Sequence, residues 1–298
     1  MMDFDAFCEI ASDAVNSIGF LRHYGILPEE MLCEQCSQKM VEHQRNDISD
    51  KINFVCNRCN TRKSIRSGSF LKDCKVPIKK FLWVVRMWAH NQIGIASFLS
   101  ISPTTSANMT KSFRKICSWK LSTLNLTLGG PGIIIQIDES VISRAMHNRG
   151  HDLLRPKRWV LGMYEATSKI GIVICIPNRK ADTLKELIMR HVLGGSIIHT
   201  DGFASYKGLE TLPVNPPYVH ETVNHSLFFR DPLTGAHTNN VEAYWASVKK
   251  SFKRGGQTRR ILLQPKIDEK MWRERFGKTP EEAFENILSH IAEYEALE

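Results

Sequence analysis

The feature that most constrains the fold is a pair of Cys-x-x-Cys motifs near the N-terminus. The motifs are Cys33–Cys36 and Cys56–Cys59, with 19 residues between them. Each motif is a tight turn that presents two thiolates to one metal ion, and four thiolates complete the tetrahedral shell of structural Zn²⁺. Disulfide bonds are the alternative, and they are disfavoured because the chain opens without a secretory signal pattern. The spacing predicts a zinc ribbon over residues 31–74, in which Ile52–Val55 forms a short strand.

The charge of the chain is concentrated in one region. The 298 residues include 40 Lys and Arg against 31 Asp and Glu, which gives a net charge of +9. Residues 75–130 contain eight basic residues and no acidic ones. A segment without carboxylates has little to offset its attraction to phosphate, so we expect double-stranded DNA as a partner. A solvated basic face is the alternative that charge alone leaves open.

Composition excludes several other classes of protein. Hydrophobic residues make up 42% of the chain and charged residues 24%, which are ordinary values for a globular protein. The longest uncharged stretch, Met87–Thr110, is rich in Asn, Ser and Thr and contains Pro103, so we expect no membrane span. We therefore expect an intracellular globular protein.

Residues 75–128 have the pattern of a helix-turn-helix module. Apolar residues recur at helical spacing over 78–89, a short helical piece follows at 95–99, and Ser102-Pro103 suits an N-cap followed by a first-turn proline. A helix over 104–119 would present polar and basic residues to DNA. Any three-helix bundle would give a similar pattern. The candidates for the major groove are Thr104, Thr105, Asn108 and Lys111, and those for phosphate are Arg114 and Lys115.

Beyond a turn-rich linker at 128–132 the sequence changes to alternating strands and helices. Its order is β-β-β-α-β-α-β-α, which is the element order of the ribonuclease H-like fold. The order predicts an α/β domain over residues 129–255 with a mixed five-stranded sheet. The predicted strands are 133–137, 159–166, 170–176, 196–200 and 218–224, and the predicted helices are 181–192, 204–209 and 237–254.

Three carboxylates lie where metal chemistry would need them. Asp138 follows the first predicted strand, Asp201 follows the fourth, and Glu242 lies near the start of the last helix. If the two strands are neighbours, both aspartates reach one edge of the sheet. Three oxygen ligands suit Mg²⁺ or Mn²⁺, and two such ions can activate water or a 3′-hydroxyl against a phosphodiester. Lys249 and Lys253 follow on a polar edge of the same helix, where they would border a DNA channel.

Each carboxylate also has a purely structural interpretation. Asp138 can cap a turn, and Asp201-Gly202 is an ordinary turn dipeptide. Asn239-x-x-Glu242 reads as a variant of a capping box. The combination of the three residues with this order of strands favours a metal site over these alternatives.

Four phrases in this order resemble one family of enzymes. The phrases are the two Cys-x-x-Cys motifs, Ile137-Asp138-Glu139-Ser140, the run from His199 to Tyr206, and the run from His237 to Trp245 followed by Lys249. The chain resembles transposases of the Merlin family of cut-and-paste DNA transposons, together with their bacterial insertion-sequence relatives. The resemblance extends from about residue 31 to about residue 255.

The resemblance implies a DDE catalytic domain of ribonuclease H-like fold behind a zinc ribbon and a helix-turn-helix. It implies Asp138, Asp201 and Glu242 as catalytic residues and ligands of Mg²⁺ or Mn²⁺, and the four cysteines as ligands of Zn²⁺. Some bacterial relatives place Asn at the third position, so Asn240 is a second candidate there. Glu139 should point to the opposite face of its strand, and structural hydrogen bonds are expected of His199 and His237. The basic residues Arg144, Arg149, Arg155, Lys157 and Arg158 are further candidates for the DNA channel.

The expected function is that of a DNA transposase that binds terminal inverted repeats, hydrolyses phosphodiesters and transfers strands. It would work as a homodimer or larger assembly, in the nucleus of a eukaryote or the cytoplasm and nucleoid of a bacterium. Helical segments are expected at 1–30 and 256–298, and the latter contains an acidic helix over 281–297 that is a candidate dimer helix or a cover for the catalytic domain. Two alternatives stay open, namely a non-catalytic DNA-binding regulator and a ribonuclease H-like nuclease that acts on other nucleic acids.

Overall fold

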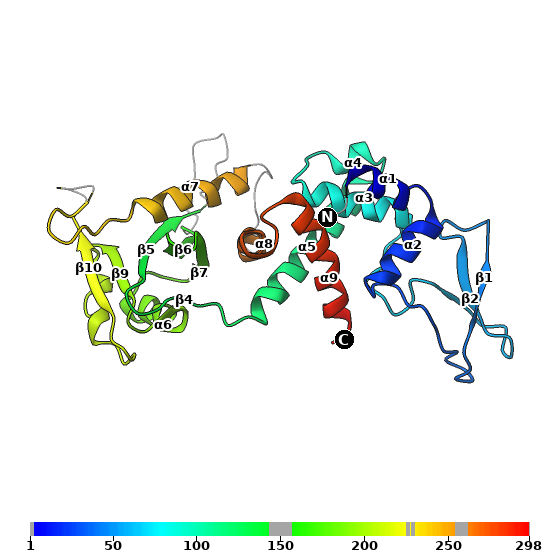
Figure 1. Cartoon of the computed structure of the whole chain (residues 1–298), viewed down its shortest axis with the longest axis horizontal. Coiled ribbons are helices and arrows are strands. Elements are labelled where there is room, and N and C mark those ends of the chain that lie inside the picture. The colour runs from blue at the N-terminus through cyan, green and yellow to red at the C-terminus, as the bar shows by residue number, and fades with distance from the viewer. Residues whose placement is uncertain (1–2, 143–156, 225–226, 228–229, 254–261, 298) are drawn as a thin grey trace. The chain divides into compact units, whose positions relative to one another are not determined.

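A computed structural model describes the chain except for residues 1–2, 143–156, 225–226, 228–229, 254–261 and 298 (Figure 1). The chain forms two compact units. The first unit is Met1–Trp119 with Phe276–Glu298, and the second unit is Lys120–Arg275. No helix in the described part is long and apolar enough to cross a membrane.

The first unit contains a small antiparallel sheet beside the four paired cysteines. Its strands lie in the order β1-β2-β3. They are β1 (Val41–Gln44), β2 (Ile52–Val55) and β3 (Arg62–Ser64). The predicted strand at 52–55 is confirmed. The sheet is tied to the chain before the next helix by the buried Arg66, whose guanidinium forms a two-pronged ion pair with Asp50 and donates to the carbonyl oxygen of Val76 at 2.8 Å.

Helices make up the rest of the first unit. They are α1 (Phe4–Ile10), α2 (Ala14–His23), α3 (Ile78–Ala89), α4 (Ile95–Phe98), α5 (Pro103–Ser122) and α9 (Pro280–Glu295). The predicted cap of α5 is confirmed, because the hydroxyl of Ser102 accepts the amide of Thr105 at 3.0 Å and Pro103 opens the helix.

The two ends of the chain share the hydrophobic core of this unit. The ring of Phe7 in α1 meets Trp83 of α3 edge-on, with ring centroids 4.7 Å apart, and Phe284 of α9 at 5.7 Å. All three helices turn apolar faces toward one another, and α9 packs on α3. The acidic C-terminal helix is therefore a core element of the first unit.

The second unit is built on a mixed five-stranded sheet in the order β10-β9-β5-β6-β7. The strands are β5 (Ile134–Val141), β6 (Trp159–Glu165), β7 (Ile170–Ile176), β9 (Ile197–Asp201) and β10 (Val219–Val223). The strands β5, β6 and β7 form an antiparallel meander, while β9 is parallel to β5 and β10 is parallel to β9. This order and these directions are those of the ribonuclease H-like fold, so the predicted five-stranded sheet is confirmed.

Smaller elements complete the second unit. The predicted linker at 128–132 contains a short strand that the sequence did not indicate, and it pairs in parallel with a second short strand. These elements are β4 (Leu128–Gly129), β8 (Val192–Leu193), α6 (Ala181–His191), and two 3₁₀ turns, η1 (Ala204–Tyr206) and η2 (Leu209–Thr211). The two turns replace the short helix predicted over 204–209.

The helix α7 (Asn239–Lys253) is seated on the sheet by two glycines. A Cβ atom at Gly162 of β6 would lie 2.5 Å from the Trp245 ring, and one at Gly171 of β7 would lie 2.3 Å from the Tyr244 ring. The two aromatic side chains therefore fill places that only glycine leaves open. Tyr244 also stacks on Tyr164, with ring centroids 4.8 Å apart.

The helix α8 (Leu263–Phe276) covers the outer edge of β7. The Gln264 side chain accepts the amide of Cys175 at 2.8 Å and donates to the carbonyl of Val173 at 3.2 Å. Arg275 donates to the carbonyl of Gly171 at 3.1 Å. Side chains of α8 thereby satisfy backbone groups that an edge strand leaves unpaired. Residues 263–275 thus belong to the same unit as the sheet, while α9 belongs to the first unit.

Candidate functional sites

The four paired cysteines form one cluster in the first unit. The Sγ atoms of Cys33, Cys36, Cys56 and Cys59 all lie within 4.8 Å of one another. Among the described residues, no other group of three or more His, Cys, Asp or Glu ligand atoms is so closely spaced. Four soft sulfur ligands from two turns fit a tetrahedral metal ion.

The two turns that carry these cysteines have the same geometry. Ser37 donates its amide to the carbonyl of Cys33 at 2.8 Å, and Asn60 donates to the carbonyl of Cys56 at 2.9 Å. Both Ser37 and Asn60 adopt a left-handed backbone, with φ of 56° and 55°. The repeated turn places each pair of thiols on the same side of its loop, which is why the cluster can form from so short a segment.

The second candidate site lies where β5 and β9 run side by side. Gln136 of β5 is the register partner of His199 of β9, and the two strands are parallel. Asp138 and Asp201 follow these partners by two residues each, so they lie on the same face as Gln136 and His199 and toward the same end of the sheet. The predicted neighbourhood of the two strands is confirmed. One detail differs, because β5 continues through pairing with β6 to Val141 and Asp138 lies inside the strand.

The carboxylate of Asp138 lies in an unfavourable electrostatic environment. Burial raises its pKa to about 6, with further contributions from the charges of Glu139 and Asp201. The indole Nε1 of Trp245 donates to its Oδ2 at 3.0 Å, which favours the charged form and partly offsets the shift. A half-buried carboxylate crowded by other carboxylates is a position that a divalent cation would stabilise, so these residues fit Mg²⁺ or Mn²⁺.

The Asp201 carboxylate is held by its own loop. Its Oδ1 accepts the amide of Phe203 at 3.0 Å, which fixes the chain as it leaves β9. The same loop brings the phenol of Tyr206 beneath the site. Burial raises the pKa of Tyr206 well above its ordinary value, and the charges of Glu139, Asp138 and Asp201 raise it further. Asp138 and Asp201, which are distant in the sequence, therefore both raise the pKa of the buried Tyr206 phenol.

Glu242 occupies the first turn of α7 and is exposed. Its Oε1 accepts the hydroxyl of Thr238 at 3.2 Å, and its amide donates to the carbonyl of the same residue at 3.1 Å. Glu242 and the two aspartates do not form a three-ligand group within 4.8 Å. The structure thus brings Asp138 and Asp201 together and leaves Glu242 at the rim, on the helix whose Trp245 contacts Asp138. The other third-position candidate, Asn240, donates its backbone amide to the side chain of Gln136 at 2.9 Å.

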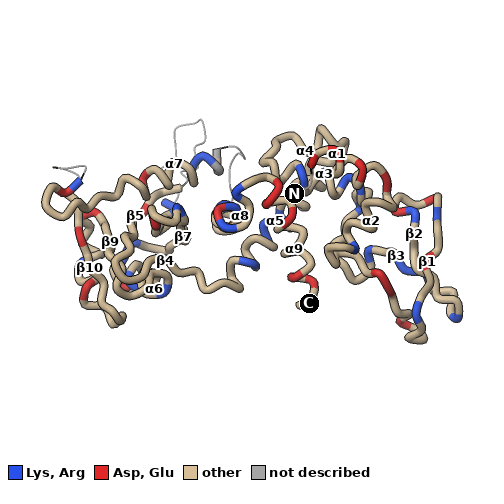
Figure 2. The backbone as a smooth tube through the Cα atoms, viewed as in Figure 1, with Lys and Arg blue, Asp and Glu red and all other residues tan. Residues whose placement is uncertain are grey.

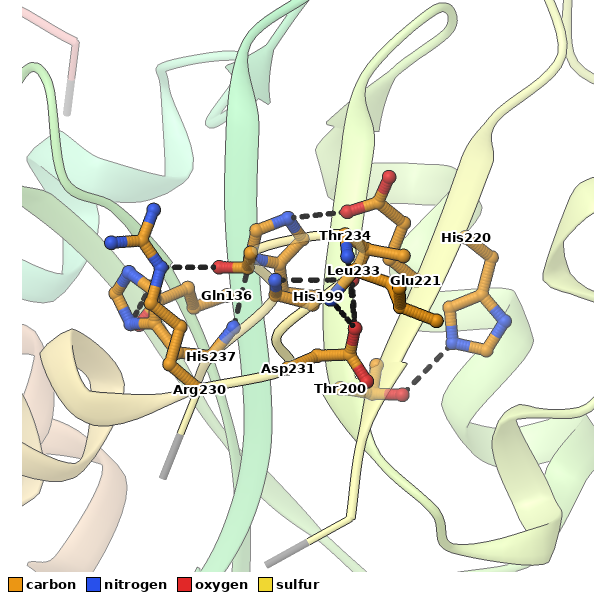
Figure 3. Close-up of polar contacts among 12 residues, drawn as sticks. Gln136, His199, Thr200, His220, Glu221, Arg230, Asp231, Leu233, Thr234 and His237 are labelled. Atoms are coloured by element: carbon orange, nitrogen blue, oxygen red, sulfur yellow. Dashed lines mark hydrogen bonds and ion pairs between the residues drawn. The ribbon is translucent and has the colours of Figure 1, made fainter. Parts of the chain in front are cut away.

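Gln136, which the sequence did not indicate as a site residue, anchors the start of α7 to the sheet and lies beside His237 (Figure 3). Its Oε1 accepts the amides of Asn240 and Val241 at 2.9 and 3.1 Å, and its Nε2 lies 3.1 Å from Nδ1 of His237. Gln136 is 1% exposed, so these contacts replace water entirely. The signal available in the sequence was a polar residue inside the apolar run 133–137, two positions before Asp138 and so on the same face of the strand.

The two predicted structural histidines belong to the same network. The Nδ1 of His199 accepts the backbone amide of His237 at 3.4 Å, and its Nε2 lies 3.2 Å from the carboxylate of Glu221 on β10. Figure 3 shows Gln136, His199 and Glu221 projecting from three neighbouring strands. The expected hydrogen-bonding role of both histidines is confirmed. The network supports the sheet face directly next to the two aspartates.

The candidate DNA-contacting residues of α5 differ in accessibility. Thr104, Asn108, Lys111 and Lys115 are exposed at helical spacing, while Arg114 is half-buried. The hydroxyl of Thr105 lies 2.7 Å from that of Ser102 and belongs to the helix cap. Figure 2 shows the basic residues along α5. The buried stripe of Met109, Phe113 and Ile116 faces the unit's core, so the polar stripe faces solvent.

The remaining basic candidates lie in the second unit. Lys249 is half-buried on α7, and the ammonium of Lys157 lies 5.8 Å from the centroid of the Trp159 ring. The side chain of Lys253 lies outside the described residues, as do Arg144, Arg149 and Arg155. Arg158 is half-buried next to Trp159.

Comparison with known proteins shows that the second unit is similar to a transposase domain. Residues 129–258 match the ISXO2-like transposase domain, a DDE domain of insertion-sequence elements. This match supports a DDE transposase or integrase type of function for the chain. A search of curated proteins gave no match.

Two solved structures with similar folds come from retroviruses. The first is the catalytic core domain of BIV integrase. The match has 15% sequence identity and a TM-score of 0.30, and it covers 52% of this chain and 95% of the integrase chain. The second is the simian T-cell lymphotropic virus intasome, solved in complex with the PP2A regulatory subunit B56 gamma. The match has 12% sequence identity and a TM-score of 0.32, and it covers 64% of this chain and 67% of the matched chain. Because both TM-scores are low, the assignment of the fold rests on the strand order β10-β9-β5-β6-β7 and not on these two matches.

Proposed function

We propose that this protein is a DNA transposase of the cut-and-paste type, related to the Merlin family, that binds terminal inverted repeats and both cuts and joins DNA at their ends. The observation that carries the proposal is the position of Asp138 and Asp201 on adjacent parallel strands, inside the region that matches the transposase domain. Glu242 completes the proposed catalytic set from the rim. In this proposal the enzyme acts as a homodimer or larger assembly, in the nucleus if the host is a eukaryote.

The proposed catalytic residues would hold Mg²⁺ or Mn²⁺. When bound, two such ions supply an activated oxygen nucleophile and stabilise the leaving oxygen of the phosphodiester. The contribution of the protein is to position the carboxylates that would bind the ions. Trp245 fixes the orientation of Asp138, the Phe203 amide fixes Asp201, and Gln136 holds the start of the helix that carries Glu242.

The first unit would supply recognition of the repeat ends. Four thiols in one cluster support a structural Zn²⁺ site, and the exposed polar stripe of α5 supports a recognition helix. Thr104, Asn108 and Lys111 are the proposed base-reading residues, and Lys115 the proposed phosphate contact. Thr105 is better placed to stabilise the helix start than to contact DNA.

The proposal is tested by cleavage and strand transfer on a duplex carrying the terminal repeat. The wild-type protein should cut only with Mg²⁺ or Mn²⁺ present, and Asp138→Ala and Asp201→Ala should each abolish cutting while repeat binding is retained. Arg190→Ala is a matched control, since Arg190 forms an exposed pair with Glu186 on α6. Glu242→Ala and Asn240→Ala then determine which third-position residue is required.

Two results would replace this function with another. Repeat-specific binding without any metal-dependent cleavage would indicate a DNA-binding regulator. Cleavage of RNA–DNA hybrids or junctions, without preference for a repeat end, would indicate a nuclease of the same fold. Cutting by the aspartate variants at the wild-type rate would show that the catalytic assignment is wrong.

A further inference from the structure

One guanidinium group in the second unit touches an unusual set of partners. Arg179, in the loop between β7 and α6, lies between two aromatic rings, 4.3 Å from the Trp159 centroid and 4.1 Å from the Phe203 centroid. Its Nη2 donates to Oε2 of Glu139 at 3.0 Å. A planar cation between two ring faces, with one edge on a carboxylate, is held in a single orientation.

These partners belong to the two chain segments that carry the proposed catalytic aspartates. Glu139 directly follows Asp138 on β5. Phe203 follows Asp201 by two residues, and its amide is the group that binds the Asp201 carboxylate. The backbone of Arg179 takes part as well, because its carbonyl accepts the hydroxyl of Ser205 from the same loop at 2.8 Å. A single residue therefore connects the neighbourhoods of both aspartates.

The Glu139 carboxylate depends on this contact. Its side chain is 1% exposed, on the opposite face of β5 from Asp138. Its Oε1 and the Arg179 Nε have no hydrogen-bond partner among the described residues, and the buried phenol of Tyr206 lies close enough to Glu139 for the carboxylate to raise the pKa of that phenol. A buried carboxylate is costly unless it is paired, so the Arg179 contact is the main compensation for Glu139.

We propose that Arg179 is a positioning residue, which holds the β5 segment of Asp138 and the loop of Asp201 at the separation that a divalent cation requires. The inference rests on the proposed function, because it assumes that both aspartates bind the ion. Arg179 acts through Glu139 and Phe203 and contacts neither aspartate. The role needs a planar guanidinium, because a lysine ammonium keeps the charge but can neither stack between two rings nor donate along a flat edge.

The test compares Arg179→Lys with Arg190→Lys in the zinc-loaded full-length protein. Arg190 is a suitable control because its salt bridge with Glu186 is exposed on both sides, at 62% and 66%. Mn²⁺ binding is measured directly from the electron paramagnetic resonance signal of the free ion, and thermal unfolding is recorded alongside. Cleavage of repeat DNA is measured separately over a series of Mn²⁺ concentrations.

We expect Arg179→Lys to bind Mn²⁺ roughly tenfold more weakly or worse, as is typical when a residue that orients a metal ligand is changed. Its cleavage should recover partly at high Mn²⁺ concentration, while Arg190→Lys matches the wild type. A variant with a lowered melting temperature and unchanged Mn²⁺ affinity would overturn the inference, because it would show a purely structural role. Absence of Mn²⁺ binding by the wild type would overturn it as well.

A second variant covers the case in which Arg179→Lys fails to fold. Arg179→Met with Glu139→Gln removes the buried charge pair together, so no unpaired charge is left behind. This double variant should fold and still bind Mn²⁺ more weakly than the wild type, and wild-type affinity would overturn the inference. If the wild type binds Mn²⁺ but cuts no DNA, the proposed function fails, while weaker Mn²⁺ binding by the variants still supports the positioning role.

Discussion

The two candidate metal sites are assembled in opposite ways. The cysteine cluster comes from a segment of 27 residues, from Cys33 to Cys59, in which one turn geometry is used twice. The carboxylate site combines Asp138 and Asp201, which are 63 residues apart in the sequence and are brought together by parallel strand pairing, with Glu242 at the rim on a helix that rests on the sheet. The comparison shows that a local site is specified by its own spacing, whereas a non-local site depends on the whole sheet. Substitutions in the cysteine cluster should therefore affect only the first unit, whereas substitutions at the carboxylate site should affect the stability of the whole sheet.

The largest expected effect is loss of the cysteine cluster. Cys33→Ser with Cys56→Ser removes one ligand from each turn, and structural zinc in small domains contributes on the order of 10 kcal/mol to folding. We expect loss of bound zinc, measured by elemental analysis, and loss of repeat-specific DNA binding. Cys8→Ser is the control, because Cys8 lies outside the cluster. Unfolding of the second unit by the same double substitution would contradict the view that this site is local.

A pH-dependent effect is expected at the carboxylate site. Because the pKa of Asp138 is raised to about 6, the folded protein takes up a proton there before the unfolded chain does. In metal-free protein the unfolding free energy should therefore rise as the pH falls from 7 to 4, by at most about 3 kcal/mol from this group. Asp138→Asn should abolish that part of the pH dependence. Chemical denaturation of both proteins across this range, without added Mg²⁺ or Mn²⁺, measures the difference, and identical profiles would refute it.

An intermediate effect is expected where α7 rests on the sheet. Gly162→Ala places a methyl group against the Trp245 ring at 2.5 Å, so the helix must shift or the ring must rotate. Overpacking of this kind costs about 1–3 kcal/mol, and here it also disturbs the indole that contacts Asp138. Denaturation monitored by tryptophan fluorescence gives the cost. Gly202→Ala has open space around its Cβ and should change stability far less; equal losses in the two variants would be evidence against this packing.

The smallest of the four effects concerns Gln136. Replacement by Leu keeps the volume but leaves two backbone amides of α7 and the His237 ring without their partner. We expect a loss of about 1–2 kcal/mol in unfolding free energy. Amide exchange at Asn240 and Val241 should accelerate while exchange in β7 stays slow. Unchanged protection of both amides would show that the helix start is held by other contacts.

Sequence reasoning was most successful where the signal is local. Helix α3 begins at Ile78 and ends at Ala89, and β7 spans Ile170–Ile176, both as the hydrophobic spacing predicts. The Ser102 cap of α5 was equally readable, because capping depends on a few adjacent residues. The neighbourhood of β5 and β9 also followed, since the order of strands restricts the possible topologies.

Other features required contacts that no short window of sequence contains. The role of Gly162 becomes visible only once Trp245, more than eighty residues away, lies on it. The stacking of Arg179 between Trp159 and Phe203 joins three separate loops and strand ends. The end of β5 was also misplaced, because its pairing with β6 outlasts its pairing with β9. In each case tertiary packing, rather than propensity, decides the outcome.

The cover that α8 provides for β7 has a practical consequence for the expression of fragments of this protein. The stretch that matches the transposase domain stops at residue 258, before α8 begins at Leu263. A recombinant fragment cut at that point would present the bare backbone of β7 to every other copy in solution, which invites intermolecular strand pairing and precipitation. Extending the fragment through Arg275 retains Gln264, Met271 and Arg275, and should decide whether the material is soluble. A fragment designed only from the family match would therefore lack α8, the helix that keeps the edge of β7 from pairing with other molecules.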